Sequence, residues 1–201
     1  ASMLEGEDAI LATTLGNEIE ATFSKHPDAK LAKEAAHFIE NSRKHLALIG
    51  KEFVVTGKTL DGEAFDWAPY QGKVVLVDFW ATWCRPCLEE IPNIRESYAN
   101  YHDKGFEVIG VNLDDEPEAA TKFLAVQPLE WATIVSSDAA NAGFKNPLAV
   151  ACGVEAIPFV MLIGKDGKVD SIHVRGKRLS DRLTKLLGPI PTEGKRPEVK
   201  P

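Results

Sequence analysis

The sequence predicts an α/β fold in which helices flank a central mixed β-sheet and an N-terminal helical hairpin precedes the sheet. Apolar residues recur at helical spacing within residues 10–49, which indicates amphipathic helices before the first strand. The run VVLVDFW at 74–80 is nearly continuous in apolar residues, as is typical of a central strand buried on both faces. Helix-like and strand-like segments then alternate to the end of the domain. We expect a helical extension at 1–50, the sheet domain at 51–188 and a proline-rich, charged and disordered tail at 189–201.

The N-terminal hairpin is predicted from two apolar stripes. In the first helix, over 10–23, the stripe contains Leu11, Leu15, Ile19 and Phe23. His26-Pro27-Asp28 then ends this helix and starts the next one, because proline is favoured at a first helical position. The second stripe contains Leu31, Ala35, Phe38, Leu46 and Ile49, and Gly50 closes it. We expect the hairpin to brace the main domain; the alternative is a surface that docks a partner.

The elements of the main domain are predicted from the period of the apolar residues, from turn residues and from helix-capping residues. Strands are predicted at 53–60, 63–67, 74–80, 106–113, 131–135, 159–163 and 168–174, with tight turns at Asp61-Gly62 and Asp166-Gly167. Helices are predicted at 84–101, 117–126, 147–152 and 179–187, where Pro117 and the pair Asn146-Pro147 mark helix starts.

Composition excludes several classes of protein. The chain has 201 residues, 44% of them hydrophobic and 26% charged, as expected for a soluble globular protein. A net charge of −7 argues against a nucleic-acid or anionic-membrane partner, since both favour basic surfaces. The first residues, ASMLEGEDA, lack the charged and apolar regions of a signal peptide and resemble a cloning scar. We therefore expect an export signal or membrane anchor to belong to the natural protein outside this sequence.

The stretch WCRPC places Cys84 and Cys87 directly after the apolar run at 74–80. Three cysteines cannot form a disulfide framework, and a tetrahedral zinc site lacks its other ligands nearby. Leu88 follows Cys87 where covalent haem attachment requires histidine. No metal or cofactor is expected. A short structural staple remains an alternative to a redox pair, although its small loop constrains the unfolded chain little.

The predicted helix assigns different roles to the two cysteines. Cys84 lies at the helix N-terminus, where free N–H groups, the helix dipole and the charge of Arg85 lower the pKa of its thiol. Cys87 lies on the apolar stripe that continues through Ile91 and Ile94. We expect Cys84 to be the exposed nucleophile and Cys87 to be the buried, resolving thiol.

The order of elements, with CxxC at the first strand-to-helix junction, resembles the thioredoxin fold. The local motifs are VDFWATWCRPC, Ile157-Pro158 after Gly153-Val154, and the Asp166-Gly167 hairpin. The segment CRPCLEEIP at 84–92 resembles more narrowly the bacterial TlpA/ResA-type thiol–disulfide oxidoreductases, which favour C-x-P-C-x-x-E-x-P. The resemblance implies a thiol–disulfide oxidoreductase, with a sheet domain of thioredoxin-like fold.

Two acids join the predicted site. Asp78 lies inside an apolar strand, so burial should raise its pKa, and the resemblance implies a proton acceptor or donor for Cys87. The alternative is an aspartate at the strand end that reaches solvent. Glu90 follows Cys87 by three residues and neighbours it on the helix. The resemblance implies that Glu90 tunes the cysteines; otherwise it is a solvated acid of the first helical turns.

The substrate-binding residues are expected to be Trp83, Arg85, Pro86, Ile157 and Pro158. The resemblance implies that Pro158 is cis, faces the cysteines and leaves backbone groups free to pair with a substrate strand. Phe159 departs from the threonine that family members often carry after this proline.

Cys152 stands apart from this motif. Because free cysteine is often buried, we expect a small core residue; a regulatory or resolving thiol is the alternative.

Two other functions fit the fold less well. A peroxiredoxin-like thiol peroxidase needs P-x-x-x-T-x-x-C, but Ala81 occupies the threonine position. A non-catalytic, metal-binding module of this fold needs a C-x-x-x-C spacing and a dedicated histidine.

The resemblance therefore favours a reductase of protein disulfides in exported proteins, such as apocytochrome c. It implies an upstream dithiol electron donor and an extracytoplasmic location on the periplasmic side, as a soluble or N-terminally anchored domain.

Overall fold

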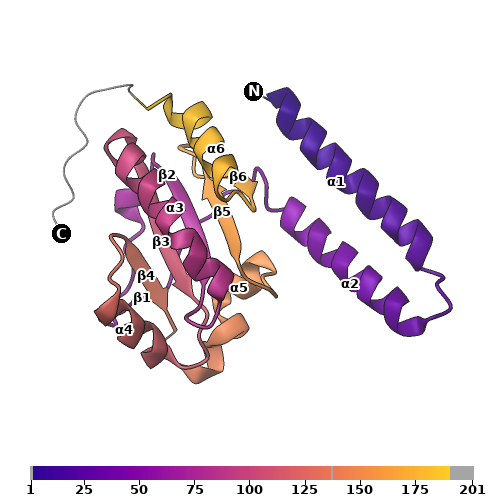
Figure 1. The fold of residues 1–201 in the computed structure, drawn as a ribbon, viewed down its shortest axis with the longest axis horizontal. Coiled ribbons are helices and arrows are strands. Elements are labelled where there is room, and N and C mark those ends of the chain that lie inside the picture. Colours follow the sequence, from indigo (N-terminus) through magenta and orange to yellow (C-terminus); the bar gives the residue numbers. More distant parts are fainter. Residues whose placement is uncertain (1, 137, 191–201) are drawn as a thin grey trace.

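The computed structural model describes residues 2–136 and 138–190, which form a helical hairpin beside an α/β domain. The hairpin consists of α1 (Ser2–Phe23) and α2 (Ala29–Leu46), and α2 lies between α1 and the domain (Figure 1). Asp28 caps α2, because its carboxylate accepts hydrogen bonds from the N–H groups of Lys30 and Leu31. Residues 191–201 of the predicted tail lie outside the described residues.

Within the described residues, six strands form one mixed sheet in the order β1-β4-β3-β2-β5-β6. Their bounds are β1 Lys58–Thr59, β2 Val74–Trp80, β3 Phe106–Asn112, β4 Ala132–Val135, β5 Phe159–Ile163 and β6 Val169–Ile172. Strand β2 runs parallel to β3 and antiparallel to β5. The predicted fold class, a thioredoxin-like mixed sheet flanked by helices with an N-terminal helical extension, is confirmed.

Helices cover both faces of the sheet. The helices of the domain are α3 Arg85–Tyr101, α4 Pro117–Val126, α5 Pro147–Cys152 and α6 Lys177–Leu187. Short 3₁₀ turns occupy Ala68–Tyr70, His102–Lys104, Ala139–Asn141 and Gly143–Lys145. In Figure 1, α3 and α6 lie side by side across one face of the sheet, and both contribute side chains to a single core cluster.

Strand β2 is buried along its whole length because it lies between two cores. Val75, Val77 and Phe79 point into the cluster shared with α5. Val74 and Leu76 point into the cluster shared with α3 and α6. Alternate side chains of one strand point to opposite faces, so a strand covered on both faces needs apolar residues at nearly every position. Asp78 interrupts this pattern on the α3 face.

The predicted strands at 53–60 and 63–67 are wrong over most of their length. Strand β1 contains only Lys58 and Thr59 and pairs with β4. Of the predicted hairpin only a short bridge is present, in which Lys58 lies opposite Ala64 and the Thr59 N–H donates to the Glu63 carbonyl oxygen. Val55 is buried in the core and Phe65 packs against it, although neither residue lies in a strand. The alternating apolar residues therefore indicate burial over a longer stretch than the strand pairing covers.

The buried face of α2 differs from the predicted stripe by one residue. Ile39 is 3% exposed, whereas Phe38, a member of the predicted stripe, is 59% exposed. Ala35 and Leu46 of the predicted stripe are half-buried, so the prediction is wrong at this position and the face is not rotated as a whole. The prediction failed because both residues are apolar, so the sequence pattern did not distinguish them.

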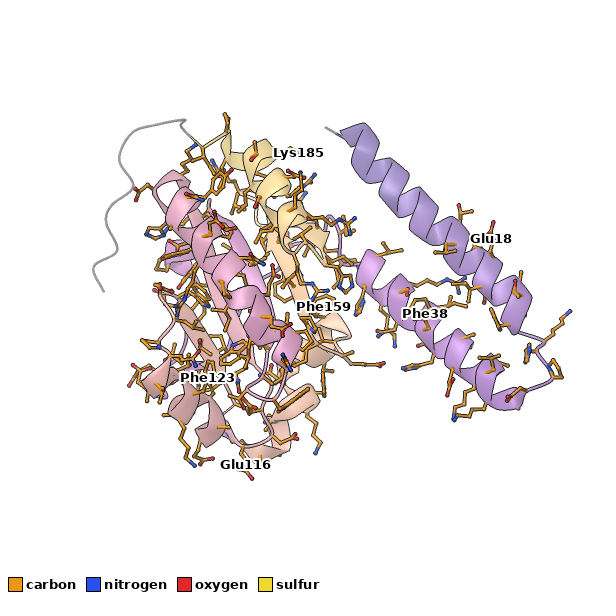
Figure 2. The ribbon with its side chains drawn as sticks, viewed as in Figure 1. Glu18, Phe38, Glu116, Phe123, Phe159 and Lys185 are labelled. Atoms are coloured by element: carbon orange, nitrogen blue, oxygen red, sulfur yellow. A yellow bond between two sulfur atoms is a disulfide. The ribbon has the colours of Figure 1, made fainter. Side chains whose placement is uncertain are left out.

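Helix α2 contacts the domain close to the loop that precedes Pro158. The His45 Nε2 atom lies 2.9 Å from the Gly153 carbonyl oxygen, and the His45 ring lies 4.8 Å from the Phe159 ring. Figure 2 labels Phe159 on the side of the domain that faces α2. In the same last turn of α2, Arg43 binds Glu20 of α1 at 2.5 Å. These contacts agree with a brace that acts through α2.

Candidate active site

Cys84 and Cys87 form a disulfide at the N-terminus of α3, directly beyond the end of β2. Cys84 is the N-cap of the helix, and its Sγ atom accepts a hydrogen bond from the Cys87 N–H at 3.3 Å. Free N–H groups at a helix N-terminus and the helix dipole stabilise negative charge. The strand therefore delivers Cys84 to a position where a thiolate is favoured.

The expected exposure of Cys84 is wrong for this disulfide form. Cys84 is 3% exposed and Cys87 is 1% exposed. Both belong to one cluster, which also contains Trp80, Ala81, Leu88, Phe123, Leu124, Leu129 and Ile157. The bond between the sulfur atoms holds Cys84 against the same apolar neighbours as Cys87. The N-cap position alone does not predict this burial, because it depends on side chains from α4 and from the loop before β5.

Asp78 lies on the α3 face of β2 and is 5% exposed. Burial is the main cause that raises its pKa, to about 7, and the nearby carboxylate of Glu90 raises it further. The charge of Arg175 acts in the opposite direction and lowers the pKa. Burial excludes the alternative of an aspartate that reaches solvent at the strand end. A carboxyl group that titrates near neutral pH can accept or release a proton under physiological conditions.

Glu90 faces the loop between β6 and α6 as well as Asp78. Its Oε1 atom accepts a hydrogen bond from the Gly176 N–H at 2.6 Å, and its Oε2 atom accepts one from Asn93 at 3.2 Å. Because Glu90 contributes to the raised pKa of Asp78, the two acids form one electrostatic unit. The sequence predicted that Glu90 would neighbour Cys87 but did not predict its link to Gly176.

The loop before β5 lies against the disulfide. The Ile157–Pro158 peptide bond is cis, and Ile157 packs against the cluster that contains both cysteines. Pro158 is half-buried, and Phe159 begins β5 opposite Phe79 of β2. The structure thus brings Ile157 and Pro158 to the CxxC motif from a distant part of the sequence.

The residues between and before the cysteines are exposed. Trp83 is 57% exposed, and its ring lies 6.2 Å from that of Phe144. The Arg85 Nε atom binds Glu89 Oε1 at 2.9 Å, and the Arg85 side chain is 89% exposed. The positive charge of Arg85 is therefore paired and screened by solvent, so its influence on the cysteines is weaker than the sequence suggested. Pro86 is exposed in the first turn of α3.

Sequence reasoning missed Asp114, a 4% exposed acid that follows β3. Its carboxylate accepts hydrogen bonds from the Thr82 N–H at 3.1 Å and from the Thr82 hydroxyl at 2.7 Å. A signal was present, because Asp114 follows the strand parallel to β2. The carboxyl ends of parallel strands lie at one edge of a sheet, so an acid directly after β3 is expected to lie near the motif that follows β2.

Cys152 is a free, buried thiol whose pKa burial raises to about 12. It packs in the cluster between the sheet and α5. The prediction of a small core residue is confirmed, and this environment makes a regulatory or resolving role unfavourable.

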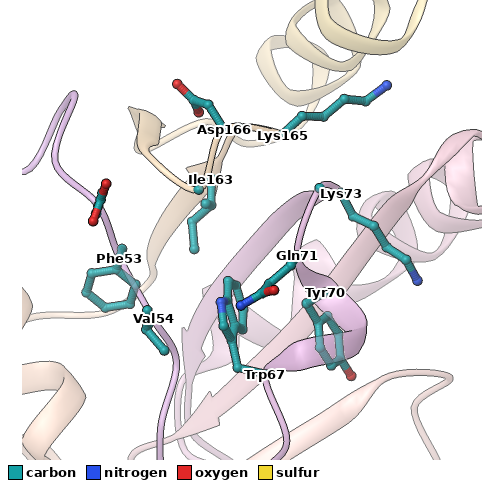
Figure 3. Close-up of a pocket in the computed structure, with 13 residues that line it drawn as sticks. Phe53, Val54, Trp67, Tyr70, Gln71, Lys73, Ile163, Lys165 and Asp166 are labelled. Carbon is teal, nitrogen blue, oxygen red and sulfur yellow. The ribbon is translucent and has the colours of Figure 1, made fainter.

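A groove on the surface of the domain lies away from the disulfide. It has a volume of about 280 Å³ and is lined by residues that include Phe53, Trp67, Tyr70, Lys73 and Asp166 (Figure 3). It lies beside the start of β2 and the end of β5, whereas the disulfide follows the end of β2. The site is therefore identified by its chemistry and not by its concavity.

Two features are absent from the described residues. No group of three or more His, Cys, Asp or Glu residues within them is arranged to hold a metal ion. None of the helices in this part of the chain combines the length and apolar character needed to cross a membrane.

Comparisons with known proteins agree on one group. A family model described as Redoxin matches residues 27–186. The thiol-disulfide oxidoreductase ResA of Bacillus cereus is 32% identical over 152 residues, which cover 74% of this chain and 82% of that protein.

Solved structures give the same result. A crystal structure assigned as a thiol:disulfide interchange protein DsbE, from Chlorobium tepidum, matches with a TM-score of 0.60 and 31% identity over 70% of this chain and 98% of that one. The thioredoxin domain of a thiol-disulfide oxidoreductase from Bacteroides vulgatus matches with a TM-score of 0.59 and 26% identity, covering 69% of this chain and 97% of that domain.

Proposed function

Because this chain belongs to the Redoxin family and is a TlpA/ResA-type thiol–disulfide oxidoreductase, we propose that it reduces disulfides of exported proteins through Cys84 and Cys87. The observation that carries the proposal is the disulfide at the N-terminus of α3, with the buried carboxyl of Asp78 on the same face of the sheet. Residues 51–188 carry the chemistry, and residues 1–50 brace the loop before Pro158.

The reaction begins from the reduced dithiol. The Cys84 thiolate attacks one sulfur of the substrate disulfide, which forms a mixed disulfide and releases the other substrate sulfur as a thiolate. Cys87, once deprotonated, attacks the Cys84 sulfur, which forms the Cys84–Cys87 disulfide and releases the second substrate sulfur. Two electrons pass to the substrate, and an upstream dithiol donor restores the reduced pair.

Asp78 serves the second step. Cys87 must lose its proton to attack, and the Asp78 carboxylate, with a pKa of about 7, is partly ionised at neutral pH and can accept that proton. Glu90 tunes this exchange, because its negative charge favours the protonated form of Asp78. Asp78 and Glu90 are therefore proposed to act as one proton relay behind the cysteines.

The exposed residues around the disulfide form the substrate surface. Trp83, Arg85 and Pro86 are exposed next to the cysteines in the chain. Ile157 packs against the cluster that contains both sulfur atoms, and the cis bond joins it to Pro158. An extended substrate segment can pair with the free backbone groups beside Pro158, while its cysteine meets Cys84.

The compartment follows from the reaction. Disulfides persist in oxidising compartments, so a reductase of protein disulfides has its substrates on the extracytoplasmic side. We place the chain on the periplasmic side, soluble or anchored through a segment outside this sequence, with apocytochrome c cysteines as the leading substrate class.

Trapping of the mixed disulfide tests the proposal. Cys87→Ser should capture substrate proteins as long-lived adducts, because no thiol remains to resolve the Cys84–substrate bond. Cys84→Ser should capture few, and Cys152→Ser is the matched control that leaves trapping by Cys87→Ser unchanged. Alkylation of the reduced wild type at mildly acidic pH should label Cys84 before Cys87 and Cys152. Trapping through Cys87 instead, or the absence of adducts together with absent insulin reduction, would falsify the proposal.

A further inference from the structure

Asp114 connects two segments that are distant in the sequence. Its side chain accepts hydrogen bonds from both the N–H and the hydroxyl of Thr82, the residue before Trp83. Its backbone carbonyl accepts a hydrogen bond from the Gly143 N–H at 3.2 Å, and Gly143 precedes Phe144. One residue therefore holds the segments that carry both aromatic side chains.

Asp114 is itself fixed in place. The Asn112 Nδ2 atom donates to Asp114 Oδ2 at 2.7 Å, and the Asp114 N–H donates to Asn112 Oδ1 at 3.1 Å. Hydrogen bonds to a carboxylate are stronger than those between neutral groups, particularly where solvent is excluded. The anchor is thus a rigid support rather than a surface contact.

The two side chains that this anchor positions are exposed and adjacent. Trp83 is 57% exposed, Phe144 is 37% exposed, and their rings are tilted by 56°. Trp83 immediately precedes Cys84 in the chain, so the aromatic pair begins one residue from the cysteine that meets the substrate. Solvent-exposed aromatic side chains that gather next to a reactive group are typical of a recognition surface.

We propose that Asp114 is a positioning residue for a docking surface made of Trp83 and Phe144, and that this surface accepts an apolar side chain next to the cysteine of the substrate polypeptide. The inference rests on the proposed function, because the polypeptide that docks is the disulfide substrate itself. The occupant follows from the surface: two aromatic rings gain from burying apolar area and offer little to a charged side chain.

Matched substrates test the docking surface. Two synthetic peptides, each joined to glutathione through its single cysteine, differ only in leucine or serine beside that cysteine. Wild type should reduce the leucine peptide with a kcat/KM about tenfold higher, as expected for one apolar side chain in a pocket, with most of the difference in KM. Phe144→Ala should bring the ratio of the two kcat/KM values, leucine peptide over serine peptide, close to one. Val150→Ala, which truncates another exposed apolar residue, is the matched control and should leave the ratio unchanged.

The anchor is tested from three sides. Asp114→Asn should lower the ratio, while Glu116→Gln, an exposed acid at the start of α4, should not. Thr82→Val removes the hydroxyl donor and should lower the ratio, whereas Thr82→Ser retains the donor and should preserve it. Gly143→Ala disturbs the Phe144 segment without altering the acid, since a Cβ atom there collides with Asp115 and Gly143 has a φ of +59°. It should therefore lower the ratio even if Asp114 variants fold poorly.

Each outcome has one meaning. A wild-type ratio near one, a ratio unchanged in Phe144→Ala, or an equal loss in Val150→Ala overturns the docking surface. A ratio unchanged in Asp114→Asn, Thr82→Val and Gly143→Ala overturns the positioning role. If wild type reduces glutathione disulfide but shows no preference between the peptides, only this inference fails. If it reduces no disulfide at all, the proposed function fails and the inference fails with it.

Discussion

Asp78 combines a functional role with a cost to stability. Burial raises its pKa to about 7, whereas an aspartate in the unfolded chain titrates near about 3.9. Between these values the native protein holds a proton that the unfolded chain has released, so stability falls as the pH rises through this window. Above neutral pH the cost is complete, on the order of 4 kcal/mol as an upper value.

We predict that Asp78→Asn stabilises the protein at pH 8 and has little effect at pH 4. The amide keeps the shape of the carboxyl group but carries no charge that burial must desolvate. Urea unfolding of both forms at the two pH values measures the difference. Asp115→Asn, which alters an exposed acid near the site, is the control and should show no such pH dependence. Equal stability of wild type and Asp78→Asn at pH 8 would contradict a buried, charged Asp78.

The same substitution should slow the reaction. Without the carboxylate, Cys87 loses its proton to water, and we expect disulfide reduction to slow about 100-fold near pH 7, the scale of general-base catalysis. The deficit should shrink as the pH rises, because Cys87 then ionises without help. Rates measured from pH 6 to 9 check this, and a constant deficit would indicate a structural effect instead.

Cys152 should be chemically silent in the native protein. Burial raises its pKa to about 12, and the other two thiols form the disulfide, so the oxidised protein offers no thiolate to reagents. Mass spectrometry after treatment with iodoacetamide should find no label in the native state and one label after unfolding. Labelling of the native, oxidised protein would revive the regulatory interpretation.

At the scale of elements, the two faces of helix α2 allow the bracing and docking roles of the N-terminal hairpin to be tested separately. Its inner helix, α2, carries the contacts to Gly153 and Phe159, and Arg43 links it to α1. Adjacent residues of α2 differ sharply: Ile39 is buried and Phe38 is exposed. The two residues therefore form a matched pair for mutation.

We expect Ile39→Ala to lower the free energy of unfolding by roughly 2 kcal/mol or more, whereas Phe38→Ala changes it by less than about 0.5 kcal/mol. Thermal and urea unfolding of the two variants give the comparison. If Phe38→Ala leaves stability unchanged but weakens turnover of a protein substrate, the hairpin also docks a partner. If both variants behave as wild type in stability and turnover, the hairpin neither braces nor docks through this face.

At the scale of the whole molecule, the direction of electron flow depends on the relative stability of the oxidised and reduced forms of the protein. A dithiol pair is strongly reducing when the disulfide form is the more stable one, and strongly oxidising when the reduced form is stabilised, as in a potential near about −120 mV. The two redox forms of one fold can therefore be compared by their stability alone.

We predict that the oxidised protein unfolds at a higher temperature than the reduced protein. This is the order expected of a reductase, since its disulfide must be favoured over its dithiol. Calorimetry with and without a reductant, together with equilibration against glutathione, measures both quantities. The reverse order, or a potential near that of a strong oxidant, would assign the chain to disulfide formation instead.

The central part of the molecule was predictable because local patterns and global fold agree there. The apolar run of β2, the CxxC motif after it and the Asp166-Gly167 turn each specify one local structure, and each occupies its predicted place. The segment at 53–67 was predicted less well, because its apolar residues pack against the core mostly outside a strand and the predicted hairpin is reduced to a short bridge at Lys58 and Ala64. The same ambiguity affected Phe38 and Ile39, since hydrophobicity alone does not orient a helix whose two faces are both partly apolar.

By itself, the sequence determined the reactive chemistry. It places two cysteines at a helix N-terminus and an acid inside a buried strand, and the family resemblance assigns the Ile157-Pro158 pair to the same site. Only the tertiary structure decided which groups surround them. It buries Cys84 with Cys87, joins Glu90 to Gly176, and brings Trp83 and Phe144 together through Asp114. The physical reason is that chain-local rules govern caps, turns and strand burial, whereas pKa values and recognition surfaces depend on residues that lie far apart in the chain and meet only when the sheet forms.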